Sequence, residues 1–282
     1  MGDVLTPDVS GQAAPSETRH KSVIFDDVKL AFDEKRVLDG VSFELLRGET
    51  KILLGAAGAG KSTILKLTLG LVKPDSGRIF VLGHEVSAMP ESDLFDVRRD
   101  IGMVFQESAL FDSLTVRENV AYRLLEEKDI PEEQVEERVR EALRFVELEH
   151  TLDLFPSELS GGMRRRVAIA RAIVSRPEIL LYDSPTGGLD PVTSTTIIEL
   201  LLKQRDVYHT SAFMVTHRLQ DAFVMATHCF DKATGQMRRI EPGENVDVKT
   251  SFVILRDGRV IFDGNAQELV SSRDKYIREY ID

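Results

Sequence analysis

Short apolar runs divide the chain into an alternating series of strand-like and helix-like segments. Residues 22–54 contain three strand-like runs, SVIFDDVKLAF, VLDGVSFEL and ETKILL, in which apolar and polar positions alternate in places. After Leu159, four further runs, EILLYD, SAFMVTH, SFVILRDG and RVIFDG, alternate with helix-like segments. Strands that alternate with helices along a chain are typical of a mostly parallel sheet. The pattern therefore predicts an α/β fold with a mostly parallel core sheet.

The middle of the chain has a helical pattern, from about Asp93 to Pro156, and we expect a helical subdomain over about 93–175. Residues 126–141 hold eight acidic and three basic residues, which indicates a solvated helix face rather than a special acidic docking site. The opposite face is apolar, because five residues recur at helical spacing: Val135, Val139, Ala142, Leu143 and Val146.

A glycine-rich segment follows the third strand-like run and fits the pattern G-x-x-x-x-G-K-[ST]. Such a loop turns successive N–H groups toward phosphate oxygens, and the helix that follows adds a partial positive charge. We expect Lys61 to meet the β- and γ-phosphates and Ser62 to ligate Mg²⁺. The residues predicted to bind the nucleotide here are Gly55, Ala56, Ala57, Gly58, Ala59, Gly60, Lys61, Ser62 and Thr63.

The helix after this loop is predicted to be buried and to end at the turn KPDSG, on account of Ile64, Leu65, Leu67, Leu69 and Leu71. A second element of the site is Asp183, which closes the strand-like run Ile179–Tyr182. Ligands of α/β sheets bind at the carboxyl ends of strands. We therefore expect Asp183 beside the phosphate loop, as a direct or indirect ligand of Mg²⁺, rather than as an ordinary helix cap.

Composition excludes several classes of protein. The 282 residues include 42% hydrophobic and 29% charged residues and no apolar run near the roughly 18–20 residues that span a bilayer. Residues 1–20 lack a secretory signal pattern and are expected to be a disordered leader before one domain at 21–282. The single cysteine, Cys229, indicates a reducing compartment and is expected to be buried. A net charge of −11 argues against nonspecific nucleic-acid binding.

The segment Leu159–Met163, LSGGM, resembles the LSGGQ-type signature of ATP-binding cassette (ABC) ATPases. Gln106, in GMVFQE, matches the glutamine loop of that family, and His217, in MVTHRLQDA, matches its switch histidine. The loop 187–190 is similar to the family's loop that touches the other subunit, and Phe32 occupies the position of an aromatic ring that stacks on adenine. Separately, each has a structural alternative: a surface glutamine, a hydrogen-bonded histidine at a strand end, and a core phenylalanine.

This resemblance covers the chain from about Ser22 onward and implies the family's fold, in which an antiparallel β subdomain and an inserted helical subdomain accompany the parallel core sheet. It implies ATP as the nucleotide and Mg²⁺ held by Ser62, Gln106 and Asp183. Helix-opening Ser160, Gly161 and Gly162 would offer donors to a γ-phosphate. Family geometry implies that these residues reach the ATP bound on a second subunit. ATP binding would then close a head-to-tail dimer, expected to be a homodimer, and ATP hydrolysis would open the dimer again.

A narrower resemblance lies in ESALFDSLTVRENVAYRLLEE and LFPSELSGGMRRRVAIARAI, which are similar to ATPases of Mla/Mce-type phospholipid transport systems. It implies an integral membrane permease, an Mce-type lipid-binding protein and a peripheral location on the cytoplasmic face of the inner membrane. Two alternatives stay open: an ABC ATPase for another cargo, and an ATP-sensing or structural subunit that does not hydrolyse ATP. A DNA-repair or translation cassette is disfavoured by the acidic charge and the single cassette.

One position departs from the family pattern. Ser184 follows Asp183, where most members carry a glutamate that orients or deprotonates the attacking water. A serine is no general base near neutral pH, and losing a positioned base lowers a rate by about 10²–10⁴-fold. Because phosphoryl transfer depends heavily on positioning, we expect slow rather than absent hydrolysis. Two origins of Ser184 stay open: a residue introduced to trap ATP, and a lineage variant with compensation elsewhere.

Two segments near the C-terminus lie outside these motifs. Residues 231–251 are expected to be an insertion, either a mobile surface loop or a contact with a partner. The ending SSRDKYIREYID is expected to be a terminal helix or a dimer contact.

Overall fold

The computed structural model describes residues 21–126, 130–241, 244 and 249–281. The expected leader at 1–20 and much of the expected insertion, at 242–243 and 245–248, lie outside the described residues. None of the helices within the described ranges is long and apolar enough to span a membrane.

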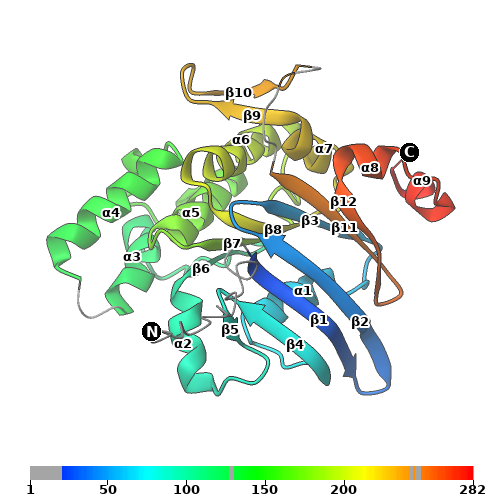
Figure 1. The fold of residues 1–282 in the computed structure, drawn as a ribbon. Coiled ribbons are helices and arrows are strands. Elements are labelled where there is room, and N and C mark those ends of the chain that lie inside the picture. The colour runs from blue at the N-terminus through cyan, green and yellow to red at the C-terminus, as the bar shows by residue number, and fades with distance from the viewer. Residues whose placement is uncertain (1–20, 127–129, 242–243, 245–248, 282) are drawn as a thin grey trace, which may run out of the picture.

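The core is a six-stranded sheet in which five strands are parallel (Figure 1). Its spatial order is β12 (Arg259–Asn265), β11 (Thr250–Arg256), β3 (Thr50–Gly55), β8 (Ser211–Val215), β7 (Ile179–Asp183) and β6 (Ile101–Val104). Only β12 is antiparallel to its neighbour within this sheet. Every residue of β3 and β8 is buried, which is why the middle of each run is continuously apolar instead of alternating. The predicted α/β fold with a mostly parallel core sheet is confirmed.

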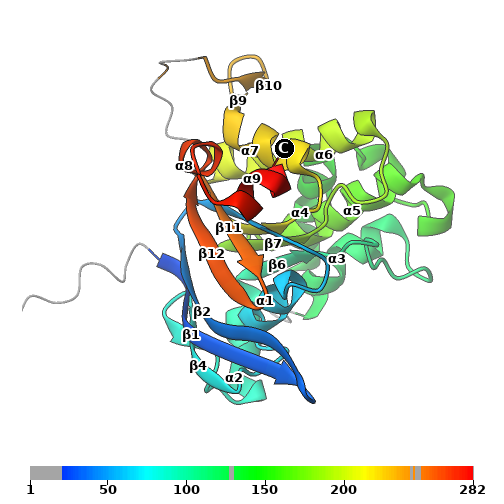
Figure 2. The ribbon, with the colours of Figure 1, turned by 90° about the vertical axis from the view of Figure 1, so that its right-hand side faces the viewer.

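A four-stranded antiparallel sheet forms the other β layer (Figure 2). Its spatial order is β2 (Lys35–Leu46), β1 (Lys21–Phe32), β4 (Ser76–Val81) and β5 (His84–Glu85). One apolar cluster joins this sheet to the six-stranded sheet and includes the buried residues of α1 (Lys61–Thr68) and α2 (Glu91–Arg99). Within it, Phe43 stacks on Phe25 at 4.8 Å and meets Phe213 of β8 edge-on at 5.8 Å between ring centroids. Helix α1 is thereby fixed between the two sheets.

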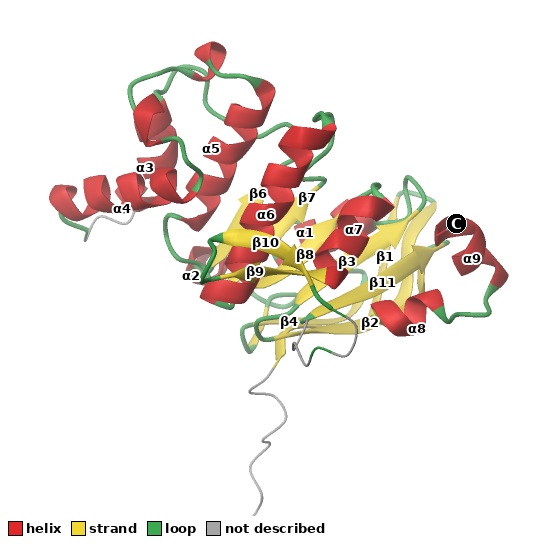
Figure 3. Cartoon of the chain, turned by 90° about the horizontal axis from the view of Figure 1, so that it is seen from above, coloured by secondary structure: helices red, strands yellow, loops and turns green. Residues whose placement is uncertain are grey.

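The remaining helices share a second apolar cluster on the opposite face of the core sheet (Figure 3). They are α3 (Val116–Glu126), α4 (Glu132–Phe145), α5 (Gly161–Ile173), α6 (Pro191–Tyr208), α7 (Leu219–Thr227), α8 (Ala266–Val270) and α9 (Lys275–Ile281), with single 3₁₀ turns at Glu149–Thr151 and Pro156–Glu158. Helices α3, α4 and α5 pack on one another and project to one side as a lobe. The five apolar residues predicted to form the buried face around α4 are all buried.

Two local features differ from the expectations. The strand β6 interrupts the range 93–175, where we expected helices; its four residues are too few to show a strand period. Part of the expected insertion forms a hairpin of β9 (His228–Asp231) and β10 (Gln236–Arg239), which lies against α6 (Figure 1). The C-terminal segment forms the expected terminal helix, α9, and buries Ile277 to 2% exposure.

A substitution at Gly102 tests the close packing of β6 on α5. A Cβ atom there would lie 2.3 Å from the carbonyl oxygen of Ala172 on α5, so Gly102→Ala forces backbone to move. Overpacking of this kind lowers the free energy of unfolding by about 1–3 kcal/mol. Urea unfolding would measure it, with Gly161→Ala as the control, because a Cβ there meets nothing closer than 3.9 Å. Equal midpoints for the two variants would contradict the packing.

Candidate nucleotide-binding site

The phosphate loop connects the end of β3 to the start of α1. Gly58 and Gly60 have φ angles of 79° and 97°, a conformation that side chains other than glycine rarely adopt. Lys61 is 5% exposed, and its ammonium donates hydrogen bonds to the carbonyl oxygens of Gly55 and Ala56, each at 2.8 Å. Burial lowers the pKa of Lys61, and the charge of Asp183 opposes that shift. The structure thus brings Asp183 beside the loop, as expected.

Ser62 and Asp183 lie together at the carboxyl edge of the core sheet. The Ser62 hydroxyl donates to a carboxylate oxygen of Asp183 at 3.3 Å. A hydroxyl and one carboxylate fit Mg²⁺, which commonly takes its other ligands from phosphates and water. Among the described residues, no three His, Cys, Asp or Glu side chains form a metal-binding group of their own. The site therefore fits a Mg²⁺ ion that arrives with a nucleotide better than a permanently bound metal.

His217 follows β8, the strand between β3 and β7. Desolvation lowers the pKa of its imidazole, the positive charge of Lys61 lowers it further, and Asp183 acts in the opposite direction. Both charged groups of the phosphate site therefore act on the ring, and its neutral form is favoured. Three residues predicted from separate sequence motifs thus meet at one edge.

Ser184 begins the loop between Asp183 and α6, in a left-handed conformation with φ of 49°. Its N–H donates to the carbonyl of Val215, and its carbonyl accepts from the N–H of Gly187, both at 2.9 Å. A Cβ atom on Gly187 would lie 3.4 Å from Cβ of Ser184 and 3.8 Å from Cγ of Gln106. Gln106, whose side chain is exposed, is therefore near Ser184.

The signature segment opens α5, as predicted. Ser160 caps the helix, because its hydroxyl accepts a hydrogen bond from the N–H of Met163 at 3.2 Å. Ser160 and Gly161 are exposed, whereas a Cβ on Gly162 would meet Thr193 of α6 at 2.4 Å. At the end of β1, Phe32 is 48% exposed, so the alternative that it belongs to the core is wrong.

Sequence reasoning missed Arg165, which lies within the run Arg164–Arg166 and gave no signal of its own. Its side chain is 4% exposed and joins two loops of the site. Toward the glutamine loop, the guanidinium donates to the carbonyl of Phe105 at 3.1 Å and to that of Gln106. Toward the loop after β7, it donates to the carbonyls of Ser184 at 3.2 Å and Gly187 at 3.4 Å. Burial lowers the pKa of Arg165.

Arg218, directly after His217, holds the same loop from its other side. Its guanidinium donates to the carbonyls of Thr186 and Leu189, each at 3.5 Å, and to the hydroxyl of Ser194 at 2.6 Å. Asp221 completes this contact, since it accepts from the Thr186 hydroxyl at 2.5 Å and pairs with Arg218 at 3.4 Å. Two arginines thus fix the loop through its carbonyls.

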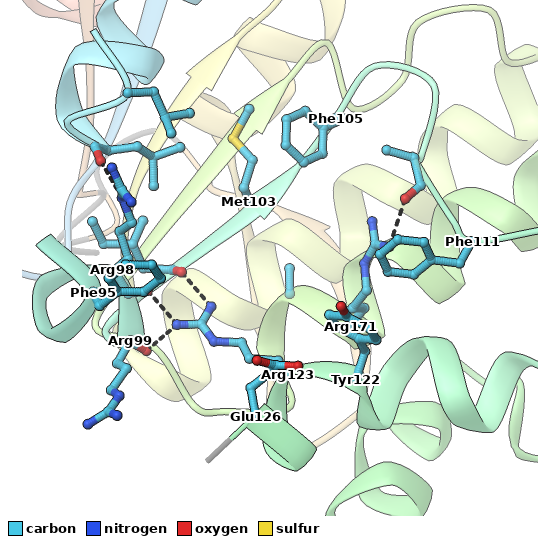
Figure 4. Close-up of a pocket in the computed structure, with 15 residues that line it drawn as sticks. Phe95, Arg98, Arg99, Met103, Phe105, Phe111, Tyr122, Arg123, Glu126 and Arg171 are labelled. Atoms are coloured by element: carbon cyan, nitrogen blue, oxygen red, sulfur yellow. Dashed lines mark hydrogen bonds between the residues drawn. The ribbon is translucent and has the colours of Figure 1, made fainter. Parts of the chain in front are cut away.

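A groove of about 650 Å³ lies beside the glutamine loop, between α2, β6 and the C-terminal half of α3 (Figure 4). Aromatic side chains line it, and four of them are at least 42% exposed: Phe95, Phe105, Phe111 and Tyr122. Leu71 also lines it and is 57% exposed, because α1 ends at Thr68; the prediction that Leu71 belongs to a buried helix is wrong. Arg123 and Arg171 donate to backbone carbonyls at the groove's border, for example to Ile101 and Ala109.

The contacts of Arg165 lead to a prediction about stability. Arg165→Met has an apolar side chain of similar length and removes the guanidinium donors from four carbonyls. The carbonyls of Phe105 and Ser184 keep the backbone N–H groups of Ser108 and Gly187 as donors. Losing the charged hydrogen bonds of Arg165 should lower the free energy of unfolding by about 2–3 kcal/mol, measured by urea unfolding. Arg164→Met is the matched control, because Arg164 is exposed and, among the described residues, its side chain donates to the Leu159 carbonyl alone, at 2.6 Å. The prediction fails if both variants unfold at the same urea concentration.

Comparisons with known proteins agree with this geometry. The family model described as ABC transporter matches residues 38–187. The chain is 36% identical over 262 residues to protein TRIGALACTOSYLDIACYLGLYCEROL 3, chloroplastic, of Arabidopsis thaliana, covering 90% of this chain and 71% of that protein. It is 32% identical over 256 residues to the intermembrane phospholipid transport system ATP-binding protein MlaF of Escherichia coli K12, covering 91% and 87%.

Among solved structures, the dimeric ATP-binding cassette MJ0796 bound to ADP and Pi is 29% identical, with a TM-score of 0.71, covering 86% of this chain and 98% of that one. The antiparallel β layer and the helical lobe described above accompany the parallel core sheet, as the sequence resemblance implied. The chain belongs to the ABC transporter family and is an ABC ATPase subunit similar to the Mla-type lipid-transport ATPases.

Proposed function

We propose that this chain is the ATP-binding and ATP-hydrolysing subunit of a transporter that moves phospholipid across the cell envelope. The observation that carries its nucleotide chemistry is the meeting of Lys61, Ser62 and Asp183 at one sheet edge, with Ser62 and Asp183 3.3 Å apart. The family and the ADP-bound cassette support ATP as the ligand. The names of the two relatives, one of which is a phospholipid transport protein, support the lipid cargo.

In this proposal, the amides of the phosphate loop bind the β- and γ-phosphates, and Lys61 leaves the carbonyls of Gly55 and Ala56 to contact them. Mg²⁺ held by Ser62, Asp183 and Gln106 would supply positive charge to the phosphates. Phe32 stacks on adenine. His217 offers a ring N–H to the γ-phosphate region. The site is completed by Ser160, Gly161 and Gly162 of a second copy, which accounts for the exposure of Ser160 and Gly161 at the start of α5.

In this proposal, Ser184 limits the rate of ATP hydrolysis. Its backbone is held in place, but its hydroxyl cannot act as the base that a glutamate supplies. The remaining groups position the phosphates and neutralise charge, so we propose a slow ATPase. The same residue supports the alternative function, an ATP-sensing subunit whose dimer closure, not turnover, regulates a complex.

Restoring the carboxylate tests this proposal. Ser184→Glu should raise steady-state ATP hydrolysis by about 10²-fold or more, while the natural chain remains above Lys61→Ala. Ser184→Gln is the matched control, because it has the shape of glutamate without a base. Hydrolysis would be measured on the purified chain together with its co-purifying membrane partners.

The outcomes separate the two functions. Turnover of the natural chain above that of Lys61→Ala supports the motor. ATP binding with turnover only in Ser184→Glu supports the ATP-sensing subunit. Equal gains with Glu and Gln at position 184 would show that no general base is missing, and failure to bind ATP would contradict both functions.

The aromatic groove of Figure 4 is the surface that we propose for the membrane permease. An amphipathic helix can lay its apolar face into such a groove. The groove also borders the glutamine loop, since Arg171 holds the carbonyls of Ser108 and Ala109 at 2.8 and 2.7 Å. Docking there would place this chain on the cytoplasmic face of the inner membrane, with an Mce-type lipid-binding protein beyond it.

A charge in the groove should release the chain from its permease. Phe95→Glu places a carboxylate at a side chain that is 62% exposed in the groove. We expect the fraction of chain that sediments with membranes of the native organism to fall at least severalfold, since a docked helix would bury this charge. Val270→Glu is the control, at a 60% exposed apolar residue of α8 outside the groove. Equal sedimentation of both variants would place the permease elsewhere.

A further inference from the structure

The C-terminal helix α9 contacts the phosphate loop directly, across 225 residues of sequence. The hydroxyl oxygen of Tyr280 accepts a hydrogen bond from the N–H of Gly55 at 3.1 Å. The same hydroxyl donates to the carbonyl oxygen of Gly55 at 3.3 Å. Burial raises the pKa of Tyr280, so the hydroxyl keeps the proton that it donates. One side chain therefore binds both polar backbone groups of the first residue of the loop.

Tyr280 is held in this position by its own helix. Ile277 is 2% exposed and anchors α9 in the core, and Asp274 accepts hydrogen bonds from the N–H groups of Tyr276 and Ile277 at 2.9 and 3.1 Å. The rings of Tyr276 and Tyr280 stack with centroids 6.1 Å apart, and the guanidinium of Arg256 lies 4.4 Å from the Tyr276 ring centroid. Figure 2 shows α9 next to α8 at this end of the molecule.

Tyr280 and Lys61 share one acceptor. The Gly55 carbonyl oxygen accepts from the Lys61 ammonium at 2.8 Å and from the Tyr280 hydroxyl at 3.3 Å. A carbonyl has two lone pairs, so both bonds can form at once. When Lys61 turns to the phosphates of a nucleotide, the carbonyl loses the ammonium and keeps only the hydroxyl of Tyr280 as a donor within this pair.

We propose that Tyr280 is a positioning residue for ATP: its hydroxyl satisfies the Gly55 carbonyl when Lys61 leaves for the phosphates, and thereby lowers the free energy of the nucleotide-bound state. Without the hydroxyl, the free protein still has Lys61 on this carbonyl, whereas the bound protein has neither donor. The loss therefore falls mainly on the bound state and weakens affinity. This inference rests on the proposed function, because it requires ATP at this loop.

Equilibrium binding of a fluorescent ATP analogue, mant-ATP with Mg²⁺, tests the inference without any need for hydrolysis. Tyr280→Phe removes only the hydroxyl and keeps the ring that stacks on Tyr276. We expect its dissociation constant to rise about three- to tenfold, the effect of losing one hydrogen bond in the bound state. Tyr276→Phe, one helical turn earlier, is the matched control and should bind like the natural chain. The melting temperature of each nucleotide-free protein is measured in parallel.

The outcomes are distinct. Equal dissociation constants for Tyr280→Phe and the natural chain would overturn the inference alone, and so would a lower melting temperature without a change in affinity, which indicates a purely structural role. The same weakening in Tyr276→Phe would also overturn it, since packing of the helix and not the Gly55 contact would then be responsible. Failure of the natural chain to bind mant-ATP would overturn the proposed function together with this inference.

Discussion

The parallel register of β3, β8 and β7 is the constraint on which the site depends. Neighbouring parallel strands end at the same edge, so Gly55, His217 and Asp183 come together although they lie far apart in sequence. These strands are buried almost throughout, and a shift of one residue would turn apolar side chains away from their cluster. The apolar composition of the strands therefore fixes where their polar ends lie.

Beyond the strand ends the backbone is irregular, and several of its carbonyl oxygens accept hydrogen bonds from arginine side chains. Ser108, Ala109 and Ser184 all have positive φ angles, and carbonyls of these residues accept from Arg165 or Arg171. Both arginines belong to α5, which opens with the signature serine. A displacement of α5 must therefore carry both loops along or break these bonds. The signature helix is therefore tied by hydrogen bonds to both the glutamine loop and the Ser184 loop.

The sequence predicts the strands, the phosphate loop and the α4 face well, because each follows from a local pattern of apolar, polar or glycine residues. It predicts little of what depends on contacts between distant segments. Arg165 lies in a run of three arginines, and only the fold distinguishes the buried one from exposed Arg164. Tyr280 resembles any tyrosine of a terminal helix until α9 reaches Gly55. The four-residue strand β6 is defined by its neighbour β7 rather than by its own pattern.

The side chain at position 184 bears on the chemistry of the site, whereas the loop backbone there is held by other groups. The backbone there is held by Val215, Gly187 and Arg165 through groups that every amino acid except proline shares, so exchanging the side chain leaves the loop in place. In the proposed function, binding of phosphates and closure of a dimer use other groups: the loop amides, Lys61 and the start of α5. In the proposed function, the loss of a base therefore slows the chemical step alone and lengthens the time that the subunit spends with ATP bound.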